Sequence, residues 1–314
     1  MQIDKDTQTL IDERIKNNAP PLESFSPQEL RALRAKMAET PLELRVEISH
    51  VENSSLRGTQ GDIPIRKYSD HPSNNIKAPV IIYFHGGGFV MGDLESHDLV
   101  CRHLCKEAKA TIIAVDYKLA PEHKFPAPVI DTKDAITKII ERAEEYNFDP
   151  NKVILCGDSA GGTLATVGTI MSRDNVIPKV HGQILVYPWV DMTMCRRSMD
   201  IELEGMILNK KTINYFADHY LNNPQEQVDW RASPLLTADL SNLPPTYIYG
   251  AGLDPLVDEG DAYKRRLLSF GNEVHYRLFP GQMHAFLSNS VQLPTALICI
   301  KEMGKAAQTI FSNL

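Results

Sequence analysis

Short apolar runs alternate with longer amphipathic segments along most of the chain. The apolar runs are rich in Val, Ile and aromatic residues and predict strands at residues 80–84, 111–117, 153–156, 182–187, 246–249 and 274–279. Segments with helical spacing of apolar residues predict helices at 96–109, 127–146, 159–172, 256–270 and 294–311. This alternation is typical of a mostly parallel sheet with helices on both faces, so we assign the chain to the α/β class.

The first 70 residues follow a different pattern. Residues 4–17 and 27–39 have the periodicity of two short amphipathic helices. Residues 43–50 and 62–68 are predicted as strands, with a polar loop from residue 52 to 61 between them. We expect these two strands to form an antiparallel edge of the larger sheet.

The alternation is interrupted between residues 190 and 223. This stretch supplies apolar side chains without a strand pattern, among them Met192, Met194, Met199, Met206, Ile207, Leu208, Tyr215 and Phe216. Flexible methionines suit an adaptable apolar wall. We predict that residues 190–223 and about residues 1–40 form a helical cap on a single domain spanning residues 1–314. The alternative is an insertion that only enlarges the core.

Composition and charge narrow the classes of partner. The 314 residues are 43% apolar, enough for one large core, and the formal net charge is -7. Since no basic run is present, nucleic acid and anionic membrane surfaces are disfavoured, and a small neutral substrate is expected. No apolar stretch reaches the length of a membrane span.

The amino-terminal residues and the cysteines favour a cytoplasmic protein. Residues 1–17 are charged and lack the apolar core of a signal peptide. The 5 cysteines are an odd number without zinc-ligand spacing, as expected of reduced thiols. We expect no metal and no cofactor. The sequence leaves the oligomeric state open, so a homo-oligomer is compatible with it.

A serine follows the predicted strand 153–156 and begins a predicted helix. The motif from Gly157 to Gly161 has the Gly-x-Ser-x-Gly pattern of a nucleophile elbow. Such a turn holds its serine in a strained backbone conformation, so small residues are needed two positions away on each side. It also directs the first amides of the helix at the group under attack. We predict Ser159 as a nucleophile; an ordinary strand-to-helix turn is the alternative.

A second motif, residues 85–89, reads His-Gly-Gly-Gly-Phe and follows the first predicted central strand. Acyl transfer to a serine places negative charge on a substrate oxygen, and backbone amides reach that oxygen only where side chains leave room. Three consecutive glycines provide that room. A phosphate-binding loop is the alternative, which the absence of Gly-x-Gly-x-x-Gly and Gly-Lys-Ser/Thr patterns disfavours.

The base and its orienting acid are expected later in the chain, because hydrolases with this elbow use the order serine, acid, histidine. His284 lies in the loop after the last predicted strand, where a surface role is the alternative. Asp254 lies where the preceding strand ends, and the cap of the next helix is its alternative role. Asp258 and Asp261 fall inside that helix and are expected to face solvent. We predict that His284 takes the proton of Ser159 and that Asp254 orients the imidazole.

With these motifs in place, the chain resembles the hormone-sensitive-lipase-like family of α/β-hydrolases, also called the bacterial family IV esterases. The resemblance spans roughly residues 78–290 and rests on residues 85–89, 96–98, 101–102, 115–127, 157–162, 254–256 and 284. It implies an α/β-hydrolase fold with a helical cap and oxyanion-stabilising amides at Gly87, Gly88 and Ala160. The family usually has glycine at the position of Ala285, a small difference that leaves the base in place.

The same resemblance implies carboxylesterase activity on short- to medium-chain acyl esters. It also implies that Asp116, Glu122 and His123 support the glycine loop, although each of them fits an ordinary loop residue. The leading hypothesis is a metal-free serine carboxylesterase that works through an acyl-enzyme. A thioesterase, amidase or deacetylase would use the same residues. A non-catalytic ligand-binding protein on this fold is a further alternative, which the presence of His284 disfavours.

Overall fold

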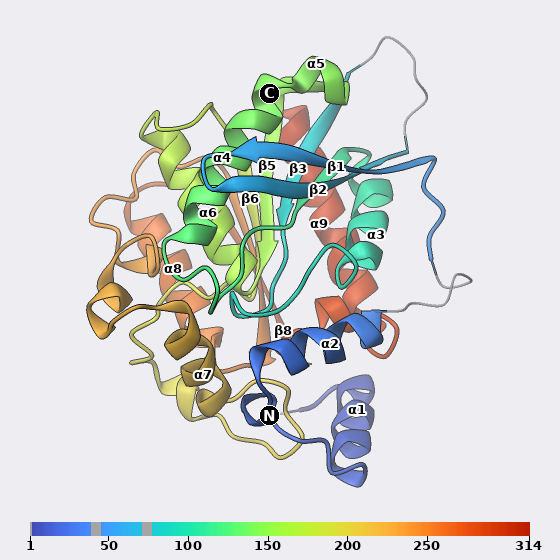
Figure 1. Cartoon of the computed structure of the whole chain (residues 1–314), viewed down its shortest axis with the longest axis vertical. Coiled ribbons are helices and arrows are strands. Elements are labelled where there is room, and N and C mark those ends of the chain that lie inside the picture. Colours follow the sequence, from blue (N-terminus) through green and yellow to red (C-terminus); the bar gives the residue numbers. More distant parts are fainter. Residues whose placement is uncertain (1, 39–44, 71–76) are drawn as a thin grey trace.

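An eight-stranded sheet forms the centre of the protein in this computed structural model, which describes residues 2–38, 45–70 and 77–314 (Figure 1). The strands are β1 (His50–Gly58), β2 (Gly61–Ser69), β3 (Ala78–Phe84), β4 (Thr111–Val115), β5 (Phe148–Asp158), β6 (Gly182–Val186), β7 (Thr246–Leu253) and β8 (Val274–Met283). Their spatial order is β1-β2-β4-β3-β5-β6-β7-β8. The β1–β2 and β2–β4 pairs are antiparallel and all other pairs are parallel, so the predicted α/β class is confirmed.

Helices cover both faces of the sheet (Figure 1). One face packs against α3 (Asp98–Ala108) and α9 (Thr295–Ser312), and the other against α4 (Ala127–Glu141), α6 (Ala160–Arg173) and α8 (Val257–Ser269). Alternate residues of β3 enter the two cores: Ile82 and Phe84 belong to one, and Ile81 and Tyr83 to the other. A strand buried on both faces needs apolar residues at every position, which explains the continuous apolar run at residues 80–84.

Three further helices lie together at one end of the molecule, at the lower end of Figure 1. They are α1 (Lys5–Lys16), α2 (Pro27–Ala38) and α7 (Lys210–Tyr220). The shorter helical segments are η1 (Leu22–Ser24), α5 (Ala143–Tyr146), η3 (Arg197–Asp200), η4 (Pro224–Val228), η5 (Pro234–Leu236) and η6 (Leu287–Asn289). The hydroxyl of Tyr215 on α7 donates a hydrogen bond to the carbonyl oxygen of Phe25 at 2.9 Å, which joins the amino-terminal segment to the insertion.

The prediction of a first strand at residues 43–50 is wrong for residues 45–49, which are not in a strand. Residues 39–44 lie outside the described residues, and β1 begins only at His50 and continues through most of the predicted polar loop. Polar residues form this strand because it is an edge strand: most of its side chains are exposed, and only Leu56 is buried. Its register is fixed by the hairpin with β2, in which Gly58 pairs with Gly61. The apolar alternation that predicts strands is therefore absent.

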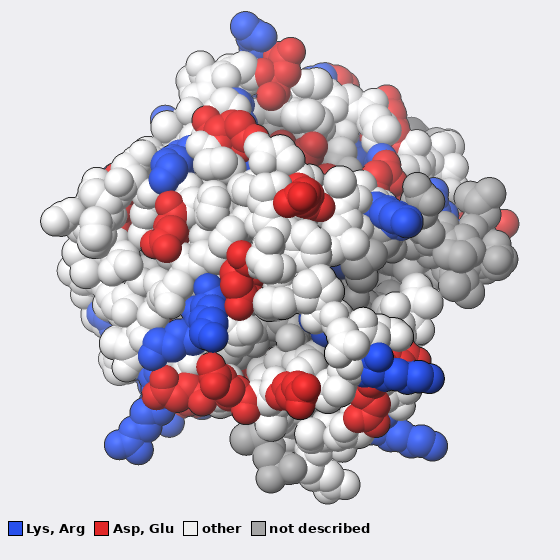
Figure 2. All heavy atoms as spheres, turned by 60° about the horizontal axis from the view of Figure 1, so that its bottom comes forward, with Lys and Arg blue, Asp and Glu red and all other residues white. Residues whose placement is uncertain are grey.

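Some other boundaries differ in smaller ways. The helix predicted for residues 127–146 is interrupted at Arg142, so that α4 and α5 are separate. The strands β5, β7 and β8 all extend beyond their apolar runs. Within the described ranges, no helix combines the length and the apolar character needed to cross a membrane. Figure 2 shows acidic and basic side chains interspersed on the face that carries the lower end of Figure 1.

Candidate active site

Ser159 lies on the sharp turn between β5 and α6, as the sequence predicts. Its backbone has φ 54° and ψ -120°, outside the regions that L-residues usually adopt. Crowding beneath the turn explains the flanking glycines: a Cβ atom at Gly161 would lie 2.0 Å from the carbonyl oxygen of Phe84. A Cβ atom at Gly157 would lie 2.3 Å from the carbonyl oxygen of Gly161. The amide of Ser159 donates a hydrogen bond to the carbonyl oxygen of Val186 at 2.9 Å, which fixes the turn against β6.

The three residues predicted for proton transfer lie in one hydrogen-bonded chain. The Nε2 atom of His284 is 2.9 Å from Oγ of Ser159, and its Nδ1 atom is 2.7 Å from Oδ2 of Asp254. Each of the three side chains is buried, and Asp254 is fully so. The ring of Tyr187 packs against the imidazole with 4.6 Å between ring centroids. A buried carboxylate on Nδ1 leaves Nε2 free to accept a proton from the hydroxyl.

Asp254 orients the imidazole and also fixes the turn before α8, but it is not the cap of that helix, because the N-cap residue is Leu256 and no side chain caps the helix. Its Oδ1 atom accepts a hydrogen bond from the amide of Leu256 at 2.8 Å, just before α8, while its Oδ2 atom faces the imidazole. The two neighbouring acids are elsewhere: Asp258 is exposed, and Asp261 forms ion pairs with Lys264 and an arginine on its own helix. The choice of Asp254 among the three acids therefore agrees with the geometry.

The glycine loop presents free amides beside Ser159. Among the described residues, none accepts a hydrogen bond from the backbone amides of Gly87, Gly88 or Ala160. Gly87 and Gly88 have φ values of 129° and 62°, which favour glycine. A Cβ atom would lie 2.0 Å from the carbonyl oxygen of Met91 at the first position and 2.3 Å from the ring of Phe216 at the second.

A buried carboxylate holds this loop from behind. Asp158 accepts hydrogen bonds from the hydroxyl of Tyr83 at 2.7 Å and from the amide of Gly86 at 3.0 Å. Its other oxygen lies 3.4 Å from Nε2 of His97. Burial alone would raise the pKa of Asp158, but these contacts with His97 and Tyr83 hold that pKa below its usual value. The residue before the nucleophile thus fixes the glycine loop.

The three supports that the family resemblance implies differ in their positions. The carboxylate of Asp116 lies 3.7 Å from Nε2 of His85. Burial alone would lower the pKa of His85, but its contact with the Asp116 carboxylate raises that pKa above its usual value. Glu122 instead forms an ion pair with Arg31 of α2 at 2.7 Å, so it fastens the amino-terminal helix rather than the loop. His123 is exposed.

A cavity of about 340 Å³ opens onto Ser159. Ser159, His284 and the three glycines form its floor, and the walls come from α1, α2, α7 and the loops near them. Most of the wall residues are apolar, including Leu22, Phe25, Leu30, Trp189, Leu208, Ile213 and Phe216. Met206 does not line it, although the next two residues, Ile207 and Leu208, do.

The sequence of this chain matches a known family. Residues 81–288, more than half of the chain, match the family described as the alpha/beta hydrolase fold. The chain belongs to this family. Its resemblance to the hormone-sensitive-lipase-like branch is confirmed by esterase relatives that match most of its length.

Several curated relatives of this α/β-hydrolase are named for ester hydrolysis. Carboxylic ester hydrolase LipN of Mycobacterium tuberculosis is 39% identical over 76% of this chain, and the match spans 64% of that relative, less than two thirds of its length. Ethyl acetate hydrolase of Pseudomonas putida is 36% identical over 72% of this chain and 71% of its own. Arylesterase of Saccharolobus solfataricus is 35% identical over 73% of this chain and 74% of its own.

Solved structures agree over nearly the whole α/β-hydrolase. An ester hydrolase from the metagenome of Lake Arreo, complexed with a derivative of bipyridine phosphonate, has a TM-score of 0.93 at 33% identity and covers 99% of this chain and 100% of its own. A hyperthermophilic esterase of Pyrobaculum calidifontis has a TM-score of 0.89 at 32% identity, with 99% of each chain covered. The amino-terminal helices and the insertion therefore have counterparts in these structures.

Sequence reasoning missed several residues that shape the site of this α/β-hydrolase. Asp158 and His97 lie in the motifs that carry the resemblance, but the sequence assigns neither of them a role. Arg34 falls in a predicted amphipathic helix, and nothing in the sequence indicates that it lines the cavity, as the structure shows. Trp189 follows a predicted strand and gave no signal of its own. In the part of the chain that the structure describes, no three His, Cys, Asp or Glu side chains converge as metal ligands would.

Proposed function

We propose that this α/β-hydrolase is a serine carboxylesterase that hydrolyses short- to medium-chain carboxylic esters through an acyl-enzyme. The observation that carries this proposal is the hydrogen-bonded chain of Ser159, His284 and Asp254 beside amides for which the described residues supply no acceptor. The three relatives described above are named as ester hydrolases or esterases, which supports the same reaction class.

The reaction begins with transfer of the Ser159 proton to Nε2 of His284 while Oγ attacks the ester carbonyl carbon. Asp254 stabilises the imidazolium that forms. The carbonyl oxygen takes up the negative charge and accepts hydrogen bonds from the amides of Gly87, Gly88 and Ala160. When the intermediate collapses, His284 gives its proton to the departing alcohol. Water then attacks the acyl-enzyme, with His284 again as the base, and the carboxylic acid leaves.

The helices at the lower end of Figure 1 serve as the cap of this enzyme. Residues 14–34 and 207–216, within the proposed cap segments 1–40 and 190–223, supply most of the apolar wall around Ser159, so they limit the chain that the pocket accepts. The amino-terminal part is held by Arg31, which also donates to the carbonyl oxygens of Val90 and Ala120 at 2.8 and 2.7 Å. The hydrogen bonds that Arg31 donates to the Glu122 carboxylate lower the pKa of Glu122 to about 2. The cytoplasmic location stays a prediction from composition.

A panel of nitrophenyl esters with two to sixteen acyl carbons tests the reaction and the pocket together. We expect turnover of the shorter esters and at least a roughly 10⁴-fold loss of kcat in Ser159→Ala, because the nucleophile is gone. Cooperative unfolding of that variant, followed by circular dichroism, controls for its folding. Full activity in the purified variant would remove Ser159 from the mechanism. Faster cleavage of matched thioesters or amides would favour the other acyl hydrolases.

A further inference from the structure

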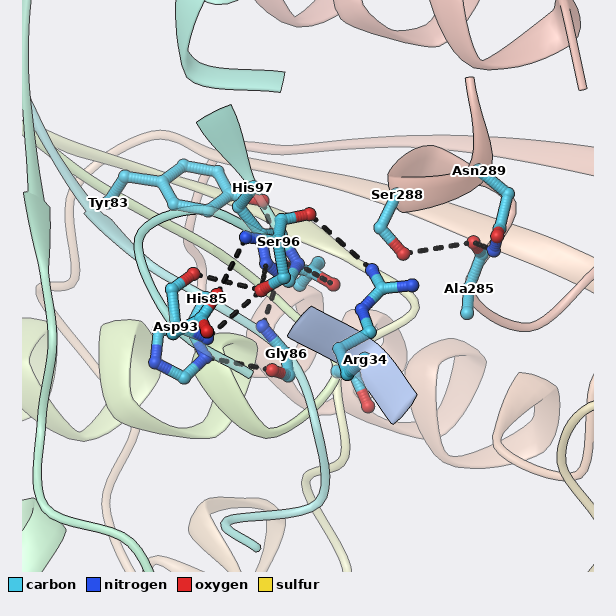
Figure 3. Close-up of polar contacts among 12 residues, drawn as sticks. Arg34, Tyr83, His85, Gly86, Asp93, Ser96, His97, Ala285, Ser288 and Asn289 are labelled. Carbon is cyan, nitrogen blue, oxygen red and sulfur yellow. Dashed lines mark hydrogen bonds and ion pairs between the residues drawn. The ribbon is translucent and has the colours of Figure 1, made fainter. Parts of the chain in front are cut away.

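Arg34 of α2 places a guanidinium group in the wall of the otherwise mostly apolar cavity. Among the described residues, the hydrogen bond that it makes is a long one, from Nη2 to the carbonyl oxygen of Ser96 at 3.5 Å. No carboxylate in those ranges lies within ion-pair distance of it. Figure 3 shows the side chain reaching from its helix toward Ser96, with Ser288 and Asn289 beyond it. A guanidinium carries five donors in a planar fork, so most of the hydrogen-bonding capacity of Arg34 is unused.

Arg31, on the same helix, has hydrogen-bond acceptors for most of the donors of its guanidinium group. Arg31 uses its guanidinium on both carboxylate oxygens of Glu122 and on two backbone carbonyls. These four hydrogen bonds fasten α2, whereas Arg34 adds only its long contact with Ser96. The structural task of a cation on this helix is therefore already performed, which leaves the position of Arg34 to be explained by the cavity.

The acids closest to Arg34 are occupied by other donors. Asp158 receives hydrogen bonds from Tyr83 and Gly86 and contacts His97, and Asp93 accepts from the amide of Ser96. Burial lowers the pKa of Arg34, and the charge of Asp158 only partly opposes this effect. A cation in an apolar wall without a paired acid is costly unless a ligand supplies the anion.

A second cation lines the same cavity. Arg14 of α1 donates from Nε to the carbonyl oxygen of Gly205 at 2.9 Å and has no carboxylate partner in the described ranges. Burial lowers its pKa as well. The cavity lining thus includes two arginines, a mostly apolar surface and one carboxylate, Asp158, which already accepts hydrogen bonds from Tyr83 and Gly86. A net charge of -7 for the whole chain does not describe this local field.

Given the esterase function proposed above, we propose that Arg34 binds a carboxylate on the substrate, so that the preferred esters carry an apolar chain and an anionic end. A monoester of a dicarboxylic acid has this chemistry. The planar fork of Arg34 matches the two oxygens of a carboxylate, which gives orientation as well as affinity. This inference replaces the neutral substrate expected from net charge by an anionic one.

Matched pairs of esters test the inference. The first pair, mono-4-nitrophenyl glutarate and 4-nitrophenyl pentanoate, differs in charge on the acyl side. The second pair, 4-carboxyphenyl acetate and 4-(methoxycarbonyl)phenyl acetate, differs in charge on the alcohol side. The quantity measured is the ratio of kcat/KM for the charged ester to that for the neutral ester. This ratio cancels any loss of activity that both esters share.

We expect Arg34→Gln to lower that ratio by about 10-fold or more in at least one pair, mainly through KM, because charge-assisted hydrogen bonds to the carboxylate are lost. Arg34→Lys keeps the charge without the fork and should lower it less. Lys36→Gln is the matched control, since it removes a cation from the exposed face of the same helix and should leave the ratio unchanged. An unchanged ratio in Arg34→Gln for both pairs would overturn the inference.

Two further measurements separate this inference from the proposed function. Glutarate should inhibit the wild-type enzyme, against a neutral ester, at least about 10-fold more strongly than glutaramide; equal inhibition would contradict a carboxylate site, whether or not the Arg34 variants fold. Calorimetric titration of glutarate into Ser159→Ala does not depend on turnover. If glutarate binds to Ser159→Ala but not to the double variant with Arg34→Gln and Ser159→Ala, and the wild-type enzyme cleaves no ester, the carboxylate site is retained and the esterase function is rejected. Ester turnover without glutarate binding would do the reverse.

Discussion

Gly161 lies beneath the nucleophile elbow in a space that has no room for a side chain. A Cβ atom there would meet the backbone of Phe84 at 2.0 Å and that of His85 at 2.6 Å, and neither strand nor helix can move away without disturbing Ser159. Gly260, on α8, is buried as well, but no atom lies within 4 Å of the position that its Cβ would take. Two buried glycines thus differ in the space beside them: Gly161 has no room for a methyl group, and Gly260 has room for one.

We therefore expect opposite effects from the same substitution. Gly161→Ala should lower the free energy of unfolding by about 1–3 kcal/mol or more, because the methyl group overpacks a rigid backbone. Gly260→Ala should raise it by about 0.5–1 kcal/mol, because alanine restricts the unfolded chain and favours the helix. Urea denaturation of both variants measures the difference. A similar loss in both would show that burial, rather than contact with backbone, determines the cost.

Glu259 forms no ion pair with any of the described residues. It is fully buried on α8, and its Oε1 atom accepts hydrogen bonds from the amides of Val190 and Asp191 at 2.6 and 3.3 Å. Its Oε2 atom is buried without a hydrogen-bond partner among the described residues. Burial raises the pKa of Glu259 well above its usual value, so the folded protein holds a proton that the unfolded chain releases.

The sign of the resulting pH dependence follows from that proton. Above the unfolded pKa of about 4.3, the unfolded state binds fewer protons than the folded state, so Glu259 makes stability fall as pH rises, by up to about 1.4 kcal/mol per pH unit. Glu259→Gln keeps an acceptor for both amides and removes this dependence. We expect the stability of the variant relative to wild type to increase from pH 5 to pH 8. A constant difference across that range, in urea titrations run beside the exposed control Glu141→Gln, would contradict this account.

In the proposed cap, α7 contributes Ile213 and Phe216 to the lining of the pocket. Phe216 is buried and its ring contacts the position above Gly88, so it limits the space next to the oxyanion amides. Met206 is nearly as buried and belongs to the same insertion, but it does not line the cavity. Sequence alone gave both residues the same role, and the structure separates them.

That difference predicts different substrate profiles for two cap variants. Phe216→Ala should raise the ratio of kcat/KM for eight-carbon to two-carbon nitrophenyl esters by about 10-fold or more, since each accommodated methylene contributes to binding. Met206→Ala should leave the ratio near that of wild type. Assays are run below the unfolding temperature of both variants, because each loses buried apolar area. If the two variants shift the ratio equally, the cap acts through general loosening instead.

At the same level, the elements that sequence predicted well were those with a buried pattern. The central strands and the helices that cover them have clear apolar patterns, because both faces of the sheet must be apolar. The edge strand β1 was placed too early in the chain, because its exposed side chains carry no such pattern and only its pairing with β2 determines it. The break between α4 and α5 at Arg142 likewise had no signal in the periodicity.

Over the whole molecule, the parallel sheet explains why so much of the site could be predicted. Parallel strands end at one edge, so Ser159 after β5, Asp254 after β7 and His284 after β8 meet there although 125 residues separate the first from the last. Arg34 could not be predicted in the same way. It reaches the cavity because an amino-terminal helix docks across that edge, and docking depends on contacts with distant segments.

Covalent capture of the nucleophile tests the central claim most directly. A small fluorophosphonate reacts with a serine that is activated by a histidine and faces oxyanion-stabilising amides. Intact-protein mass spectrometry and peptide mapping should find one phosphonyl group per chain, on Ser159, and none in Ser159→Ala. His284→Ala should slow the labelling strongly while leaving the protein folded. An adduct on a different residue, or undiminished labelling of Ser159→Ala, would contradict the account.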